Sequence, residues 1–176
     1  DNVSASFESG KVHALVGKNG SGKSTLMKII SGAYTADEGE IIYDGQTMKF
    51  KDPMSAAAQG IATVYQELSL VPTMSVTENI LIGRMPKKGK LIDWKSAKKQ
   101  VKELLKELEI DIDPDKNVEE LSMWQRQMVE IAKAMSFNPK VLQFDEPTSS
   151  LASHEVEMLF QMIRRLKEKG VIITYV

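Results

Sequence analysis

The stretch GKNGSGKS, residues 17–24, decides the fold. It matches the pattern G-x-x-x-x-G-K-[ST] and lies between a strand-like run, residues 12–16, and the helical sequence STLMKIISG. Glycines adopt backbone conformations that other residues avoid, so this loop can turn its amide N–H groups toward a phosphate. The positive end of the following helix favours the same anion. A chance glycine-rich turn is the alternative, and the flanking strand and helix argue against it.

Each residue type in this loop has an expected task on a nucleoside triphosphate. Lys23 is expected to bridge the β- and γ-phosphates, and the Ser24 hydroxyl is expected to hold Mg²⁺. The residues predicted to contact phosphates are Gly17, Asn19, Gly20, Ser21, Gly22, Lys23, Ser24 and Thr25.

Two acids follow the apolar run at residues 141–144. A carboxylate at the end of a buried strand is placed to hold the Mg²⁺ of a nucleotide, which makes Asp145 a metal ligand. Glu146 follows one step further on and is the candidate general base for the attacking water. A pair of acids that merely caps a helix is the alternative, and the phosphate loop upstream favours the catalytic interpretation.

Strand-like and helical segments alternate along the chain and predict an α/β fold with a mainly parallel central sheet. The strand-like runs are residues 12–16, 40–43, 61–65, 141–144 and 171–176. Apolar residues at spacings of three and four predict helices over residues 94–108 and 156–166. Gly39 and Gly45 bracket a short strand, residues 40–43, that is expected to be antiparallel.

The segment between the strand-like runs at residues 61–65 and 141–144 has a different character. Residues 75–135 are predicted to be mostly helical, with no good strand, as a helical subdomain inserted into the sheet domain. We therefore expect one nucleotide-binding domain, with residues 1–74 and 138–176 as the α/β core and about 75–137 as the helical part. The strand-like opening VSASF and the apolar ending VIITYV predict a fragment or a truncated product.

Composition excludes several classes. Of 176 residues, 23 are Lys or Arg and 24 are Asp or Glu, and this balance argues against nucleic acid as a partner. Without cysteine there is neither a disulfide nor a thiolate metal site. No apolar run approaches the roughly 20 residues that cross a bilayer.

Four motifs, in this order and spacing, resemble those of an ABC-transporter ATPase. They are the loop at residues 17–24, VYQE at residues 64–67, LS..Q at residues 121–125 and DEPTSSL at residues 145–151. The phrases VHALVGKNGSGKSTLMKIISG, SVTENILIGR, LIDWKSA and QRQMVEIAKAM are similar to the first ATP-binding domain of bacterial monosaccharide importers of the ribose, galactoside or xylose type. The resemblance covers essentially the whole chain and implies a P-loop NTPase that binds ATP and Mg²⁺.

The resemblance also implies roles for single residues. Gln66 matches the glutamine that contacts Mg²⁺ and the attacking water, and residues 149–152 match the loop that communicates across the dimer. Ser122 and Gln125 match the signature, which contacts the ATP of the partner domain. The implied partners are a second nucleotide-binding domain arranged head to tail, membrane permease subunits and, indirectly, a periplasmic sugar-binding protein. The implied location is the cytoplasmic face of the bacterial inner membrane.

Several residues depart from the family pattern. The adenine-stacking aromatic residue and the histidine that contacts the γ-phosphate have no match in the sequence. Gln143 is polar in an otherwise apolar strand, and a buried amide without partners costs about 1–3 kcal/mol. Met123 and Trp124 stand where the family commonly has two small residues, which predicts a poor γ-phosphate clamp. Ser122 and Gln125 also form a capping box, so a purely structural role for them stays open.

Three functions remain open from the sequence. The first is an ATPase that powers sugar import, the second a truncated or degenerate domain that binds ATP without useful turnover, and the third an ABC protein acting on DNA or ribosomes. The near-neutral charge argues against the third. A crowded basic segment, residues 84–106, is either a docking face for membrane subunits or acidic lipids, or the solvated face of a helix. The core-filling methionines are predicted to be Met27, Met128, Met135, Met158 and Met162.

Overall fold

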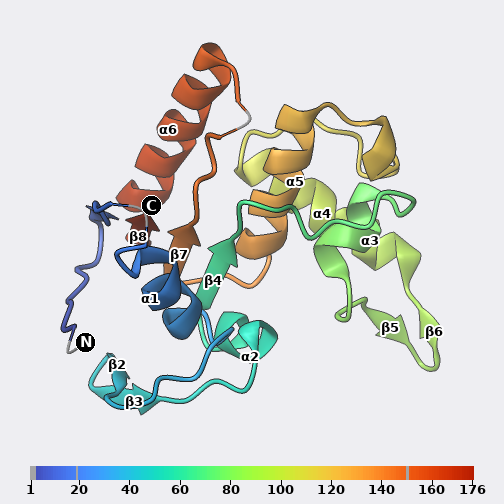
Figure 1. Ribbon diagram of the computed structural model, residues 1–176. Helices are drawn as coiled ribbons and strands as arrows, with labels where there is room; N and C mark the ends of the chain where they lie inside the picture. Colours follow the sequence, from blue (N-terminus) through green and yellow to red (C-terminus); the bar gives the residue numbers. More distant parts are fainter. Residues whose placement is uncertain (1–2, 19, 150) are drawn as a thin grey trace.

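A computed structural model describes residues 3–18, 20–149 and 151–176 of the chain (Figure 1). Its central sheet has four parallel strands in the order β1 (Val12–Ala14), β8 (Ile172–Tyr175), β7 (Val141–Phe144) and β4 (Ile61–Val64). The predicted α/β class and parallel sheet are therefore confirmed. Each of these strands is as long as the strand-like run predicted from the sequence, or shorter.

Both faces of this sheet are covered, because alternate residues of each strand meet different helices. In β7, Leu142 and Phe144 belong to the main core, which includes residues of α5 (Met123–Met135) and α6 (Ser153–Glu168). Val141 belongs to a smaller cluster on the other face, formed with residues of α1 (Lys23–Ile30) and α2 (Pro53–Ala58). Helices on both faces explain why β7 is fully buried and, apart from Gln143, apolar.

A small antiparallel sheet joins β2 (Ile41–Tyr43) to β3 (Gln46–Met48). The two residues between them, Asp44 and Gly45, both have positive φ, at 50° and 73°. This is the backbone of a tight hairpin turn, for which Asp-Gly is a favoured pair. The predicted antiparallel strand is confirmed.

The segment after β4 is mainly helical, with α3 (Val76–Leu81), α4 (Trp94–Glu107), a 3₁₀ turn (Val118–Glu120) and α5. It also contains a hairpin of two short strands, β5 (Lys87–Lys88) and β6 (Leu91–Ile92), so the expectation of no strand here is wrong. Each strand has only two residues, which is too short for an alternating pattern to reveal in the sequence. No helix in the described residues is long and apolar enough to span a membrane.

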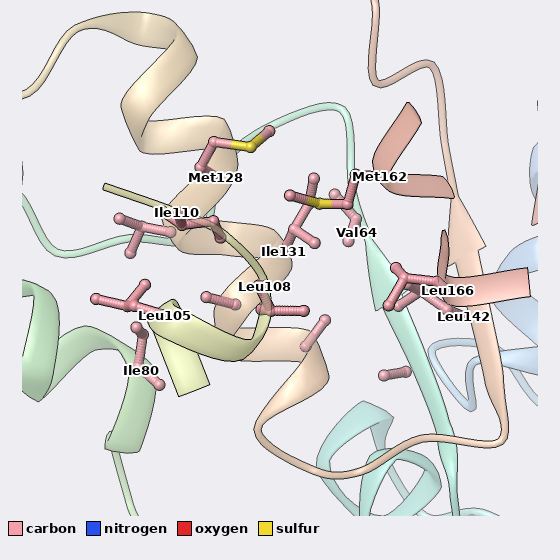
Figure 2. Close-up of a cluster of buried hydrophobic side chains, with 14 of the residues drawn as sticks. Val64, Ile80, Leu105, Leu108, Ile110, Met128, Ile131, Leu142, Met162 and Leu166 are labelled. Atoms are coloured by element: carbon pink, nitrogen blue, oxygen red, sulfur yellow. The ribbon is translucent and has the colours of Figure 1, made fainter. Parts of the chain in front are cut away.

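One hydrophobic core joins the sheet to this helical segment. In Figure 2, Ile131 of α5 lies between Val64 and Leu142 of the sheet on one side and Leu105 and Ile80 of the helices on the other. The division into a core of residues 1–74 and 138–176 and a helical subdomain of residues 75–137 stays a prediction.

Two smaller expectations are wrong. The opening run VSASF forms no strand in the part that the structure describes, residues 3–7, because no other described strand pairs with it. Met158 is half exposed rather than core, since it lies on the outer side of α6. Met27, Met128 and Met162 are buried as predicted, and Met135 packs against the main core.

Candidate functional site

The carboxyl ends of the parallel strands lie along one edge of the sheet and carry the predicted site. Backbone hydrogen bonds extend past the strands: Leu15 N–H donates to Tyr175 at 2.8 Å, and Asp145 N–H donates to Val64 at 3.0 Å. The phosphate loop after β1, the acids after β7 and Gln66 after β4 therefore all leave the sheet at this edge. Only β8 separates β1 from β7, so the two motifs start about 10 Å apart, twice the strand spacing.

Two glycines of the phosphate loop are favoured by their backbone conformation. Gly20 and Gly22 have φ of 80° and 94°, in the left-handed region that favours glycine. A Cβ on Gly17 would lie 2.6 Å from the Ser21 Oγ, so a side chain there would require the Ser21 hydroxyl to move. Asn19, also predicted to bind phosphate, lies outside the described residues.

The N-terminus of α1 faces the end of this loop without a cap. Gly22 is the N-cap residue, and no side chain in the described part of the chain bonds to the first amides of the helix. By helix geometry these N–H groups have no intrahelical partner either. Ser24 and Thr25 lie in this first turn and are exposed. The result is a positive helix end with free donors, as an anion site requires.

Lys23 is folded back over the loop. Its Nζ donates to the carbonyl oxygens of Gly17 at 2.9 Å and Lys18 at 3.1 Å. The ammonium is therefore held at the inner side of the loop, where a bound phosphate chain would lie.

The two acids differ in their surroundings. Burial raises the pKa of the Asp145 carboxyl above its ordinary value, the neighbouring Glu146 raises it further, and Lys28 lowers it. Glu146 is exposed and has a φ of 46°, a conformation that non-glycine residues seldom adopt. Its N–H donates to Val176 at 3.1 Å, so hydrogen bonding across the sheet edge holds this unusual backbone in place.

The donor set at this edge fits a magnesium nucleotide better than an isolated metal ion. No group of three or more His, Asp or Glu side chains in the described residues lies close enough to hold a metal by itself. Mg²⁺ in proteins commonly takes one or two carboxylates or hydroxyls and completes its shell with phosphate oxygens and water. Asp145, just after β7, and Ser24, in the first turn of α1, have the oxygen groups that such a partial set would need.

Gln66 is exposed and stands on a loop that is tied at both ends. Just before it, the Tyr65 hydroxyl bonds to Ser31 Oγ at 3.2 Å, at the end of α1. Just after it, Ser69 Oγ donates to Glu130 Oε1 at 2.7 Å and accepts from Lys133 Nζ at 2.8 Å, both on α5. This Gln66 loop, residues 65–69, therefore links the phosphate-loop helix to the helical segment. Sequence reasoning missed the link, because its partners are far apart in the chain.

Gln143 has the partners that its burial demands. It accepts from Thr63 Oγ1 at 2.8 Å and donates to the Met27 sulfur at 3.2 Å. Thr174 of β8 donates to the same sulfur at 3.6 Å. Strand pairing puts Thr63, Gln143 and Thr174 in one row beneath α1. A polar residue at the same position of three neighbouring strands is the sequence signal for this row.

The signature residues lie elsewhere, at the start of α5. Ser122 Oγ accepts from Gln125 N–H at 3.3 Å, and Gln125 Oε1 accepts from Ser122 N–H at 3.0 Å. The predicted capping box is thus present. Within the described residues no hydrogen bond or ion pair joins Ser122 or Gln125 to the phosphate loop. The structure therefore does not bring the signature and the loop of one chain together.

The two bulky signature residues have different environments. Met123 is 49% exposed, whereas Trp124 is partly buried and packs against the main core. The exposed bulk beside the start of α5 is therefore that of Met123. In the loop after Glu146, Ser149 N–H bonds to Glu146 at 3.4 Å, and Ser150 lies outside the described residues.

A glycine-rich loop between a parallel strand and an uncapped helix, with an Asp-Glu pair just after another strand of the same sheet, puts the chain among the P-loop nucleotide-binding proteins. Residues 1–149 match the model of the ABC transporter family. The chain belongs to this family.

Two proteins similar to this chain are named as ATP-binding proteins of sugar import. The chain is 48% identical to the arabinose import ATP-binding protein AraG of Vibrio parahaemolyticus, over 99% of this chain and 35% of the relative. It is 50% identical to a putative ribose/galactose/methyl galactoside import ATP-binding protein 1 of Agrobacterium fabrum, over the same shares. The chain thus spans about a third of the length of these relatives.

Solved structures of similar fold are ABC cassettes. A nucleotide-free ATP-binding cassette from an ABC transporter has a TM-score of 0.86 at 31% identity, covering 99% of this chain and 73% of that one. The ADP conformation of the cassette MJ1267 has a TM-score of 0.84 at 33% identity, with the same coverage. The dimeric cassette MJ0796 has a TM-score of 0.81 at 28% identity, covering 99% of this chain and 78% of that one. The P-loop, mainly parallel fold predicted from the sequence is confirmed.

Proposed function

We propose that this chain binds ATP with Mg²⁺ and hydrolyses it to power the import of a monosaccharide across the bacterial inner membrane. The single observation that carries the proposal is the shared sheet edge. There the uncapped start of α1 and the acids after β7 face the same space.

The expected division of labour follows from the chemistry of these groups. The amides at the end of the phosphate loop and Lys23 bind the phosphates, with Gly17, Gly20, Ser21, Gly22 and Thr25 lining them. Ser24, Asp145 and Gln66 hold Mg²⁺, which supplies charge neutralisation on the phosphate oxygens. Glu146 orients and deprotonates the attacking water, and its exposure leaves room for that water.

We also propose that two such domains meet head to tail, with Ser122 and Gln125 contacting the ATP of the partner. This accounts for the separation of the signature from the phosphate loop within one chain. The dimeric cassette MJ0796 supports an assembly of this kind.

Coupling to permease subunits would use the Gln66 loop. A groove of about 200 Å³ opens between α2 and α5 and is lined in part by Tyr65, Ser69, Glu130 and Lys133. A permease segment seated there would contact the loop that joins α1 to α5, so its position would depend on the nucleotide state. The protein would then work at the cytoplasmic face of the membrane, and the names of the relatives support a monosaccharide as cargo.

The test compares nucleotide binding and hydrolysis by the chain and by Glu146→Gln. We expect the variant to bind ATP with Mg²⁺ as the wild type does and to lose about 10²- to 10⁴-fold in hydrolysis rate, the usual contribution of a general base. Glu157→Gln, an exposed glutamate on α6, is the matched control and should hydrolyse normally. Absence of ATP binding, or equal hydrolysis by Glu146→Gln and the wild type, would contradict the proposal.

A further inference from the structure

The positive charge of this chain is concentrated in one segment. Residues 79–102 contain eight basic residues and a single acid, Asp93, although the whole chain has a net charge of −1. The Asp93 carboxylate is engaged in capping α4, since Oδ1 accepts from Ser96 N–H at 3.0 Å and Oδ2 from Ser96 Oγ at 2.8 Å. One carboxylate cannot balance eight cations, so the segment presents a net positive surface even though Lys98 and Lys99 pair with Asp115 and Glu103 outside it.

The hairpin β5–β6 combines this charge with exposed apolar side chains. Lys87, Lys88 and Lys90 are exposed and form no ion pair within the described residues. Beside them Leu91 is 77% exposed, Ile92 41% and Trp94 45%. A hairpin whose only neighbour is water needs the lysines but has no use for exposed apolar side chains. The combination of the two therefore indicates more than a solvated charged surface.

The hairpin projects from the helical segment, on the side away from β1 and α1 (Figure 1). The connection that leads from α3 into the hairpin adjoins the groove between α2 and α5. The Arg84 guanidinium lies 3.6 Å from the centre of the Phe137 ring, and a Cβ on Gly83 would lie 3.9 Å from Met54. Met54 and Phe137 both line that groove. The hairpin is therefore continuous with the surface proposed to meet the permease, and it leaves the nucleotide edge free.

We propose that the β5–β6 hairpin and the start of α4 form a contact with the surface of an anionic phospholipid bilayer. Lysine ammonium groups attract anionic headgroups, and leucine, isoleucine and tryptophan side chains enter the boundary between headgroups and acyl chains. Tryptophan in particular favours this boundary, because its ring is apolar and its N–H is polar. The contact would orient the domain on the membrane next to its permease, and in this respect it rests on the proposed function.

The test uses the purified chain and vesicles, without nucleotide, so its result does not depend on ATP hydrolysis. Co-sedimentation is measured with vesicles of phosphatidylglycerol and phosphatidylcholine in equal parts and with vesicles of phosphatidylcholine alone. We expect binding to the anionic vesicles that weakens at high salt. The triple variant Lys87→Gln, Lys88→Gln, Lys90→Gln should lower the partition coefficient roughly 100-fold, because each lysine near such a surface contributes about a factor of five.

A matched control removes the same charge elsewhere. Lys11→Gln, Lys140→Gln and Arg164→Gln change three exposed cations outside the segment and should retain binding within about a factor of two, since long-range attraction is screened by salt. Equal losses in the two triple variants would overturn the proposal, because the binding would then reflect net charge alone.

Tryptophan fluorescence tests the apolar part. The chain has two tryptophans, so Trp124→Phe leaves Trp94 as the sole reporter. We expect its emission to shift to shorter wavelength on anionic vesicles and the shift to vanish in Leu91→Ser, Ile92→Ser. No vesicle binding by the wild type, or binding only when permease subunits are reconstituted in the vesicles, would overturn the lipid contact, and the second result would assign the hairpin to a protein partner.

Discussion

The starts of α1 and α5 are both predicted to contact ATP phosphates, but they are built in opposite ways. The N-cap of α1 is Gly22, with a φ of 94°, and no described side chain satisfies the first amides. The N-cap of α5 is Ser122, and its capping box with Gln125 satisfies amides on both sides of the helix start. One helix start thus leaves its first amides for a ligand, whereas the other satisfies the amides of Ser122 and Gln125 internally.

This difference separates function from stability. At α1 the groups that face the ligand hold little of the fold together, so changing them should affect binding. At α5 the same groups cap the helix, so changing them should affect the free energy of unfolding even when no nucleotide is present. Ser122 can still serve a partner's phosphate, because its hydroxyl oxygen accepts the capping bond while its hydrogen stays free to donate.

The largest expected effect comes from Lys23→Ala. Among the described residues the ammonium bonds only to the loop carbonyls of Gly17 and Lys18, so its loss should change the free energy of unfolding by less than about 0.5 kcal/mol. A charge-assisted bond to phosphate is worth about 1.5–3 kcal/mol, so ATP affinity should fall roughly 10- to 100-fold. Titration with a fluorescent ATP analogue measures the affinity, with Lys11→Ala as the control. A large drop in melting temperature with unchanged ATP affinity would show that Lys23 serves stability rather than binding.

The contrast between the two helix starts also shows what sequence could foresee. The phosphate loop and the acids were predictable, because their chemistry is local: loop, helix start and strand end are adjacent in sequence. The capping box was equally local. The partners of Gln143 and the ties of the Gln66 loop were not, since they join residues 34–116 positions apart. The two-residue strands of the β5–β6 hairpin were missed because two residues are too few to show a repeating alternation.

The second prediction concerns what holds α1 in place from below. Gln143→Leu removes the bonds to Thr63 and Met27 and leaves the Thr63 hydroxyl without its partner, at an expected cost of about 1–3 kcal/mol in unfolding free energy. Denaturant unfolding measures this cost. If it arises from the stranded hydroxyl, the double variant Gln143→Leu, Thr63→Val should recover much of the loss. If the losses in unfolding free energy of the two single variants add in the double variant, the row of Thr63, Gln143 and Thr174 would contribute through packing instead.

A smaller effect is expected at the capped helix. Ser122→Ala should lower the free energy of unfolding by about 1 kcal/mol, the usual value of an N-cap side chain. ATP affinity of the isolated chain should not change, because no bond joins Ser122 to the phosphate loop in the described residues. Ser122→Thr keeps an acceptor at the cap and serves as the control. Should Ser122→Ala weaken ATP binding by the isolated chain, the two helix starts would not be independent.

The smallest effect is expected from Met123→Ala, which tests the predicted weakness of the signature. Met123 is half exposed, so its truncation should change the free energy of unfolding by less than about 0.5 kcal/mol. Trp124→Ala provides the contrast and should destabilise more, because the indole packs against the main core.

In an assembly with two nucleotide-binding domains, Met123→Ala should raise the rate of ATP hydrolysis if bulk at the start of α5 weakens the clamp. The rise should occur with the fold intact, because Trp124 contributes to the stability of the core, whereas Met123 limits access of the partner's phosphate to the start of α5. An unchanged rate for Met123→Ala, together with a rise for Trp124→Ala, would place the obstruction at the indole despite its packing. An unchanged rate for both would mean that the start of α5 tolerates two bulky residues, since its capping box positions Ser122 without help from its neighbours.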